Sequence, residues 1–368
     1  MLATVLRGTD RRMSKWTPWL VAVLLVVAAT LPAAAQHETA DRLVDRFGAH
    51  SVRRTSSSGI CSATAQAVLH ACKNEVKDDL WEAIAVCLNV SGDDESAECM
   101  AEADDDRKEA AEECGDQFEA RTELCDLLGE DRYDPDFAPA NFDDDFTQLT
   151  RPNAYFPLTI GNTWRYEDGD ETVVVQVLAE TKRIQGVTCI VVNDVVTDDG
   201  AVIEDTDDWI AQAKDGSVHY CGELARDFET FLGDDPEEPE LVEIDGSFKA
   251  GRDGAKSGIL MLAMPQVGVA YRQEWAVGDA EDAAQVLSTS YGFGNDPDLD
   301  AFVPQELADL LCHDDCVVTR DFTPLEPGHE ERKYFAPGVG LFLEVDVESG
   351  DTLELEDCNF AAVCGLLP

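Results

Sequence analysis

Six of the twelve cysteines are spaced as a palindrome, and disulfide formation is the chemistry that this spacing favours. The positions equidistant from residue 93 are Cys61 with Cys125, Cys72 with Cys114, and Cys87 with Cys99. Facing residues of two antiparallel helices have a constant sum of residue numbers, so the palindrome predicts a helical hairpin closed by three nested disulfides. A metal cluster is less well matched, because these cysteines include no C-x-x-C pair.

The remaining cysteines all lie downstream of this segment. They are Cys189, Cys221, Cys312, Cys316, Cys358 and Cys364. A local disulfide is favoured for Cys312 with Cys316, and a metal site that adds His313 is the alternative. Cys358 and Cys364 are close enough in sequence to close another small loop. The first two cysteines fall on predicted strands and could bridge them, but the spacing leaves their pairing open.

The sequence contains no recognisable catalytic motif. There is no G-x-S-x-G elbow, no H-E-x-x-H zinc motif and no phosphate-binding glycine loop. His329-Glu330 begins a zinc-protease pattern, but Lys333 stands in the place of its second histidine. His219 is a lone histidine on a predicted strand, where packing or surface exposure is commoner than general-base catalysis. No cofactor is indicated.

Paired carboxylates are the remaining candidates for acid and base chemistry. The candidates are the adjacent Asp207 and Asp208, together with Glu274, which lies beside Trp275. In a cleft, such carboxylates could serve a hydrolase that acts on an extracellular polymer. In a chain this acidic, pairs of this kind also arise by chance.

Aromatic residues on predicted strands either fill a core or line a ligand cavity. Those considered are Trp164, Tyr166, Trp209, Tyr220, Tyr271 and Trp275. From this set we select Trp209, Tyr220, Tyr271 and Trp275 as candidate ligand-binding residues.

Two segments of different character must position these residues. Residues 59–128 form the Cys-rich hairpin, and residues 129–152, with prolines between aspartates and aromatics, are typical of a linker. From 153 to 360, runs rich in Val, Ile, Thr, Tyr and Phe alternate with turn dipeptides and predict a β domain. Residues 361–368 form a C-terminal tail. The expected class is α+β.

Short turns without helical crossovers predict that the β domain is antiparallel. From Leu341 to Glu348, the apolar Leu341, Leu343, Val345 and Val347 share one face of a strand, and the charged Glu344, Asp346 and Glu348 share the other. We therefore expect one buried and one wet face. About ten such strands must curl to hide their apolar side, which predicts a curved antiparallel β-sheet or a barrel-like domain.

The N-terminus predicts export. Basic residues, an apolar run over 19–31 and three alanines at 33–35 indicate a signal peptide over 1–35, followed by a flexible segment over 36–58. No run reaches the ~20 apolar residues that a membrane span needs. We therefore expect an exported protein, periplasmic or extracellular, as the cysteine content also suggests.

The formal net charge of −49 excludes nucleic acid as a partner, because the phosphate backbone repels such a surface. Weak calcium binding remains open. The best candidate, Asp296, Asp298 and Asp300, fails the EF-hand pattern, because Ala301 and Leu307 replace the required Gly and Glu.

Several segments of the β domain resemble motifs of a group of uncharacterised exported bacterial proteins. They are Asn153-Ala-Tyr-Phe-Pro-Leu, Gly161-Asn-Thr-Trp-Arg-Tyr-Glu, and the stretches 208–216, 265–274 and 334–340. The first motif and the Ala-Pro-Gly-Val-Gly turn are similar to those of exported TapB and DUF3108-type domains. This resemblance covers most of residues 153–357 and implies a curved antiparallel sheet, but it carries no activity.

These observations favour a non-enzymatic exported protein that binds a small apolar ligand or a protein partner at the cell envelope. The hairpin would then be a rigid spacer or docking arm. The alternative is the extracellular hydrolase that uses paired carboxylates.

Overall fold

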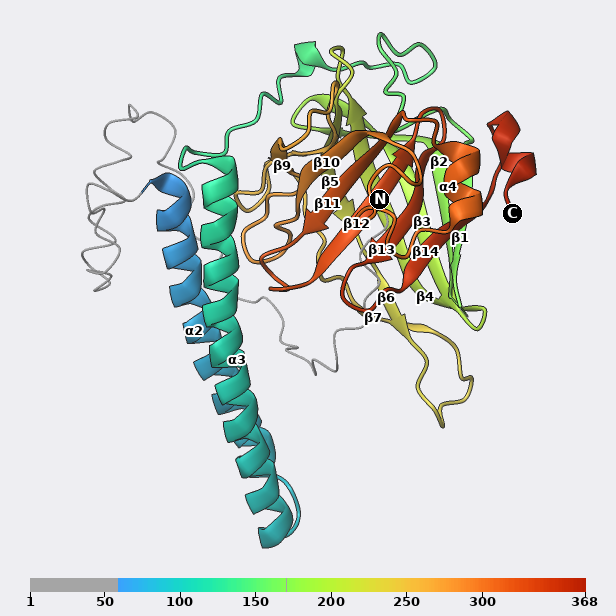
Figure 1. Ribbon diagram of the computed structural model, residues 1–368. Helices are drawn as coiled ribbons and strands as arrows, with labels where there is room; N and C mark the ends of the chain where they lie inside the picture. Colours follow the sequence, from blue (N-terminus) through green and yellow to red (C-terminus); the bar gives the residue numbers. More distant parts are fainter. Residues whose placement is uncertain (1–58, 170) are drawn as a thin grey trace. The chain divides into compact units, whose positions relative to one another are not determined.

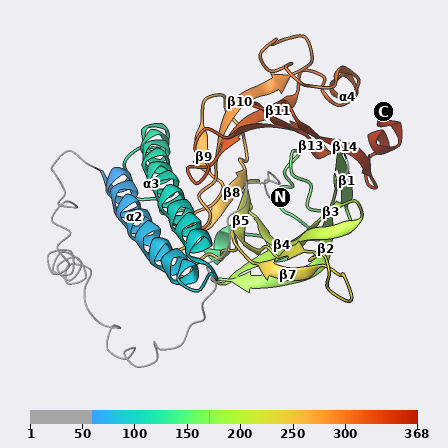
Figure 2. The ribbon, with the colours of Figure 1, turned by 90° about the horizontal axis from the view of Figure 1, so that it is seen from below.

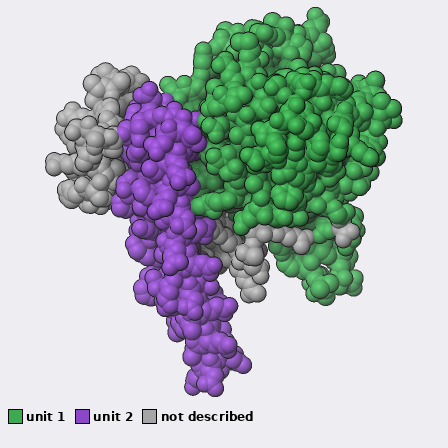
Figure 3. All heavy atoms as spheres, in the orientation of Figure 1, with its two compact units in different colours: residues 1–4, 133–368 green, residues 5–132 purple. Residues whose placement is uncertain are grey.

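The computed structural model describes residues 59–169 and 171–368, which form two compact units (Figure 3). One unit comprises the described residues up to Arg132, and the other comprises Tyr133–Pro368. The expected signal peptide and the segment 36–58 lie outside the described residues.

The first unit is an antiparallel helical hairpin of α2 (Ile60–Cys87) and α3 (Asp93–Leu128) (Figure 1). The palindrome is confirmed, because the disulfides are Cys61–Cys125, Cys72–Cys114 and Cys87–Cys99. Their Cα atoms are 5.7, 5.8 and 5.5 Å apart, within the usual range for a disulfide.

Little apolar surface is available to hold the hairpin together. The residues buried in α2 are Ala65, Val76 and Cys87, and Ala103 is among the few buried in α3. Small side chains let the helices approach closely enough for the disulfides, but they bury little area. The three disulfides therefore supply much of the stability of this unit.

The second unit is built on a 14-stranded antiparallel sheet. Its strands are β1 (Thr163–Asp168), β2 (Glu171–Ile184), β3 (Val187–Asp198), β4 (Ala201–Gln212), β5 (Val218–Leu224), β6 (Asp227–Glu229), β7 (Glu240–Glu243), β8 (Gly258–Met261), β9 (Ala270–Arg272), β10 (Ala283–Tyr291), β11 (Cys316–Phe322), β12 (Glu330–Ala336), β13 (Gly340–Asp346) and β14 (Thr352–Cys358). One short helix, α4 (Gln305–Leu311), and two 3-10 turns, η2 (Pro139–Asn141) and η3 (Ala362–Leu366), accompany them.

The sheet is strongly curved and is not closed into a barrel. Its main path runs β7-β6-β4-β3-β2-β1-β14-β13-β12-β11-β10-β9, while β5 pairs with β4 and β8. In Figure 2 these strands curve around a common interior. An isolated bridge beside β8 and β9, in which the Lys256 amide donates to the Trp275 carbonyl oxygen at 2.8 Å, links the β5–β8 branch to the β9 end of the path. The sheet thus has an inner face, which surrounds this interior, and an outer face.

Most of the expected linker is part of the β unit. Phe142 is 1% exposed and packs in a core cluster with Ile184 and Trp209. The Tyr133 hydroxyl donates to the Ser257 carbonyl oxygen at 2.8 Å. The prolines of this segment predicted a linker, but its aromatic side chains hold it against the sheet.

The prediction that one face of β13 is exposed to solvent is wrong at Glu344, which is only 8% exposed. Glu344 lies opposite Lys333 of β12 and faces the interior with it. The neighbouring Tyr334 points to the outer face, where it packs on Tyr291 and donates to the Leu299 carbonyl oxygen at 2.7 Å. Both faces of the sheet are covered here. The alternation of polar and apolar residues therefore shows that the two faces differ, but it does not show that the polar face is exposed to solvent.

The remaining disulfides all lie in the β unit. Cys312–Cys316 and Cys358–Cys364 are local loops, as expected, and Cys189–Cys221 joins β3 to β5 on either side of β4. No cysteine is free. Six disulfides are characteristic of an exported protein that folds in an oxidising compartment outside the cytoplasm.

Candidate functional site

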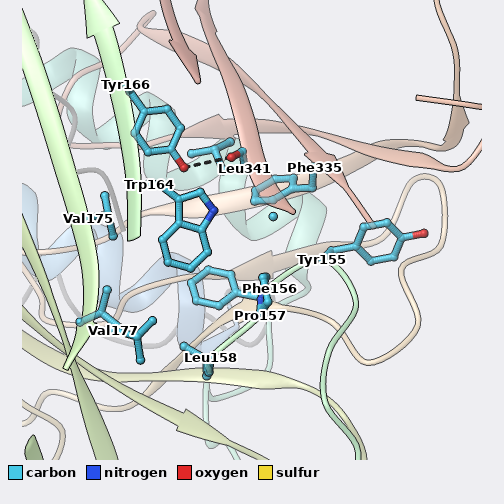
Figure 4. Close-up of a pocket in the computed structure, with 12 residues that line it drawn as sticks. Tyr155, Phe156, Pro157, Leu158, Trp164, Tyr166, Val175, Val177, Phe335 and Leu341 are labelled. Carbon is cyan, nitrogen blue, oxygen red and sulfur yellow. Dashed lines mark hydrogen bonds between the residues drawn. The ribbon is translucent and has the colours of Figure 1, made fainter. Parts of the chain in front are cut away.

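The interior of the curved sheet holds an apolar pocket of about 50 Å³ (Figure 4). Strands β1, β2, β3, β12 and β13 form its walls, and the segment 155–158 lies across it. The lining residues are Tyr155, Phe156, Pro157, Leu158, Trp164, Tyr166, Val175, Val177, Val192, Phe335, Gly340 and Leu341. The volume can hold a short apolar group, whereas pockets for drug-sized ligands are typically about 300–1,000 Å³.

Hydrogen bonds fix the two aromatic rings that β1 contributes to the pocket. The Trp164 indole N–H donates to the Val339 carbonyl oxygen at 2.8 Å, and the Tyr166 hydroxyl donates to the Leu341 carbonyl oxygen at 2.9 Å. Both bonds cross from β1 to the region of β13. The polar atoms of the rings are thereby satisfied, and their apolar faces remain available to the cavity.

Gly340 allows the segment 155–158 to lie close to β13. Its φ is +94°, a conformation that favours glycine. A Cβ atom at this position would also be 3.2 Å from Cδ of Pro157. The chain therefore needs glycine here for both backbone and packing reasons.

A buried carboxylate, Asp194, borders the pocket. Asp194 follows Val192 by two residues on β3 and lies opposite Val175 of β2, so the three side chains share the inner face. Both valines line the pocket. Asp194 is 1% exposed, and neither of its carboxylate oxygens has a hydrogen-bond partner in the described part of the chain.

Further acidic side chains follow on β4 and β5. The cross-strand register places Glu204 opposite Val196, and Asp208 opposite both Val192 and Glu223. The Tyr220 hydroxyl bonds to the Asp208 carboxylate and lies 2.7 Å from Oε2 of Glu223. This part of the inner face therefore carries several carboxylates beside the apolar pocket.

The one lysine of the described interior cluster is fully engaged elsewhere. Nζ of Lys333 lies 3.2 Å from Glu331, 3.3 Å from Glu344 and 4.0 Å from Asp321. Burial opposes its charge, but the surrounding carboxylates raise the pKa of Lys333 well above its ordinary value. The Gln273 amide also donates to Asp321, at 2.8 Å. Three carboxylates already share this cation.

Burial is the main reason why the pKa values of the interior carboxyl groups are raised. It raises the pKa of Asp194 to about 7, that of Glu223 to about 7 and that of Asp282 to about 6. The negative charge of Glu204 adds to the effect on Asp194 and Glu223. The inner face is thus an environment in which added positive charge would be favourable.

The four residues selected from the sequence do not share one cavity. Trp209 packs in the cluster around Phe142 on the outer face, with Nζ of Lys182 3.1 Å from its ring centroid. Tyr220 is on the inner face, because it bonds to Asp208, the chain neighbour of Trp209. Adjacent strand residues point to opposite faces, so these two aromatic rings are separated by the sheet.

The other two selected residues are also apart from the pocket. Tyr271 packs with Ala284 and Val286 in a separate buried cluster. Trp275 is half-buried, with its ring centroid 4.3 Å from the Arg272 guanidinium carbon and 5.8 Å from the Tyr133 centroid. None of the four lines the pocket described above.

Three further expectations concern the role of His219, the binding of a metal ion and the absence of a membrane-spanning segment. His219 is a packed residue: its ring lies 5.0 Å from that of Phe142, and burial lowers its pKa to about 4. Within residues 59–169 and 171–368, no group of three or more His, Cys, Asp or Glu could hold a metal ion, so weak calcium binding gains no support. None of the described helices has the length and hydropathy to cross a membrane.

Comparison with known proteins identifies no family for this chain. No family model and no curated protein matches the sequence. Among solved structures, a "putative lipoprotein from Parabacteroides distasonis" is similar at 11% identity and a TM-score of 0.26, covering 56% of this chain and 99% of that one. The resemblance to TapB and DUF3108-type domains is therefore not confirmed.

The pocket lies where motif segments meet. Tyr155 to Leu158 belong to the first segment of the resemblance, Trp164 and Tyr166 to the second, and Gly340 ends the last. Trp164 and Tyr166 are among the strand aromatics noted in the sequence but not among its four candidate ligand-binding residues, and no sequence motif points to Asp194. The indication that could identify Asp194 is its position between Val191-Val192 and Val195-Val196 on β3.

Proposed function

We propose that this protein is an exported, non-enzymatic binding protein that holds a small amphipathic ligand in the interior of its curved sheet. The single observation that carries the proposal is the apolar pocket around Trp164 and Tyr166, two of whose lining valines, Val175 and Val192, are strand neighbours of the buried Asp194. An apolar wall beside a few oriented polar groups is the usual composition of a ligand site.

Several features support binding over catalysis. Asp208 is 0% exposed and bonded to Tyr220, so a polymeric substrate has no open groove to it. The hydrolase alternative still has one observation in its favour, because Asp208 lies opposite Glu223, and the charge of Glu223 also contributes to the raised pKa of Glu274. Loss of hydrolytic activity in an Asp208→Asn, Glu274→Gln double variant would support that alternative, whereas unchanged activity would remove these residues from it.

The first test is the mass of the folded protein. Protein exported through an oxidising compartment would be measured by native, non-reducing mass spectrometry. We expect an excess mass that disappears on denaturation, because a ligand bound within the interior should copurify. In parallel, n-butanol as a small neutral amphipathic probe should shift the NMR signal of the Trp164 indole N–H.

A matched pair of variants locates the binding site. Val177→Phe fills the pocket, since Val177 lines it and is 1% exposed. Val174→Phe is the control, because Val174 lies on the same strand but is 36% exposed. We expect loss of the excess mass and of the probe shift only in Val177→Phe. Absence of both signals in the wild-type protein would contradict the proposed function.

A protein partner at the cell envelope is the second form of this proposal, with the stapled hairpin as spacer or docking arm. Its support is the length of α2 and α3, which are 28 and 36 residues long and have few buried side chains. Retrieval of a defined envelope protein by the full chain, and its loss when residues 60–128 are deleted, would test this form. The residence of the protein, periplasmic or extracellular, would follow from the partner found.

A further inference from the structure

Asp194 is an unusual residue in this interior because its charge has no described partner. Its side chain is 1% exposed, and both carboxylate oxygens are without a hydrogen bond. No ion pair of the described chain includes it, whereas Asp205 and Asp207 on the next strand pair with Arg226 at the outer face. Burying a carboxylate without a donor or a cation costs several kcal/mol as an order of magnitude. Such a group is retained where something else satisfies it.

The position of Asp194 connects it to the proposed ligand pocket. It is two residues from Val192 on β3 and directly opposite Val175 on β2, and both valines line the pocket. On β1, Tyr166 also lines the pocket and lies near enough to sense the charge of Asp194. A ligand that fills the apolar cavity would therefore bring its polar end to the Asp194 carboxylate.

The electrostatic surroundings select a cation for that polar end. Among the described residues, the charged groups that act on Asp194 are Glu204 and Asp205 of β4 and Glu223 of β5, all acidic. Lys333 is occupied by its own three carboxylates. An anionic ligand would be repelled, and a neutral hydroxyl could donate only one hydrogen bond. An ammonium group supplies three donors and a full charge, which matches two unbonded carboxylate oxygens.

We infer that the interior recognises a primary alkylammonium ion, with its short apolar chain in the pocket around Trp164 and its ammonium group bound to Asp194. This inference rests on the proposed function and identifies its ligand class. The small volume of the pocket, about 50 Å³, restricts the apolar part to a few carbon atoms. The acidity of the whole chain would also attract such a ligand from solution.

The test compares n-butylammonium with n-butanol, which has the same chain and no charge. Affinities would be measured by NMR titration at pH 8, where Asp194 is largely ionised, on the wild type, Asp194→Asn and Asp207→Asn. Asp207→Asn is the matched control, because it removes the same charge from an adjacent strand but from a residue that is paired with Arg226 at the outer face. We expect the ammonium ion to bind at least tenfold more tightly than the alcohol. We expect that advantage to be lost in Asp194→Asn and kept in Asp207→Asn.

The outcomes separate this inference from the proposed function. If both probes bind equally and Asp194→Asn changes neither, the ammonium assignment is overturned while the pocket stands. If the ammonium affinity falls equally in both variants, the attraction is a general property of the acidic chain, and the assignment is again overturned. If neither probe binds the wild type, the proposed function and this inference fail together. Should Asp194→Asn not fold, wild-type protein at pH 5.5 replaces it, since protonation should weaken ammonium binding and leave butanol binding unchanged.

Discussion

At the scale of single residues, interior carboxyl groups such as Asp194 are buried, and their pKa values are raised toward neutral pH. Asp194 is hard to single out in so acidic a chain, and the valines on either side of it are its one indication of burial. Glu344 was misread for a related reason: alternation with Leu343 and Val345 predicts two faces but does not say that both are covered. The sequence therefore identifies the strands better than it identifies the environment of each face.

Stability should fall as the pH rises through the titration of these groups. The pKa of Asp194 is raised from 3.8 to about 7 and that of Glu223 from 4.5 to about 7, so the folded state holds protons that the unfolded state has already lost. Stability is then present at low pH and is lost as the pH passes 7. Between pH 6.5 and 8.5, we expect a loss of roughly 1 kcal/mol for each of the two groups in urea unfolding of ligand-free protein.

The control for this pH dependence is Asp194→Asn, which should lose less stability over this pH range than the wild type. His219 opposes this trend only at the lower end of the window, because burial lowers its pKa from 6.5 to about 4 and the stabilisation that follows is nearly complete by about pH 7.5. A free energy of unfolding that is flat or rising from pH 6.5 to 8.5 would contradict the burial of ionisable carboxyl groups in the interior.

At the scale of elements, the sequence predictions are accurate where local geometry determines the structure and fail where contacts between distant residues determine it. Helix periodicity and a constant residue sum determined the hairpin, since disulfides between facing helices tolerate little displacement. The linker was misjudged because Phe142 and Tyr133 make contacts with residues far away in sequence. The pocket could not be located for the same reason: its lining residues come from segments more than 150 positions apart, such as Tyr155 and Leu341.

The hairpin should depend on its central disulfide. We expect the double variant Cys72→Ser, Cys114→Ser to lose about 2–4 kcal/mol of hairpin stability, because few buried side chains compensate for the lost crosslink. Hydrogen exchange measured by mass spectrometry should show faster exchange across α2 and α3. The matched control is Cys358→Ser, Cys364→Ser, which removes a disulfide of the β unit and should leave hairpin exchange unchanged. Equal protection of the hairpin with and without Cys72–Cys114 would show that side-chain packing suffices.

The turn between β12 and β13 should be sensitive at one glycine and less so at its neighbour. Gly338 and Gly340 both have positive φ, at +79° and +94°, so alanine costs about 1–2 kcal/mol of backbone strain at either position. Only at Gly340 would the added Cβ also press on Pro157, at 3.2 Å, whereas nothing lies within 4 Å at Gly338. We expect Gly340→Ala to lower the free energy of unfolding more than Gly338→Ala, and to shift the Trp164 indole signal. Equal effects of the two variants would argue against close packing of the segment 155–158 on the turn.

At the scale of the whole molecule, like charge opposes the compact state. The formal net charge of −49 is spread over both units, and the described ion pairs engage few of the acidic groups. Interior carboxylates add to this repulsion without contributing to solubility. The same charge favours cationic ligands over anionic ones, so stability and ligand choice share one electrostatic cause.

Screening of this repulsion should stabilise the folded protein. We expect the melting temperature at pH 7.5 to rise by roughly 5 °C between about 20 mM and 500 mM NaCl, because salt shortens the range of repulsion between exposed carboxylates. Near pH 4.1, where the net charge of the chain is close to zero, the same salt increase should have little effect. Calorimetry at both pH values therefore separates charge screening from a general effect of salt on apolar surface. If salt raises the melting temperature equally at both pH values, self-repulsion is not the cause, and the acidic coat costs the fold little. If the rise is confined to pH 7.5, a bound alkylammonium ion should reduce the salt effect only slightly, because it neutralises one charge of the interior and leaves the exposed carboxylates unchanged.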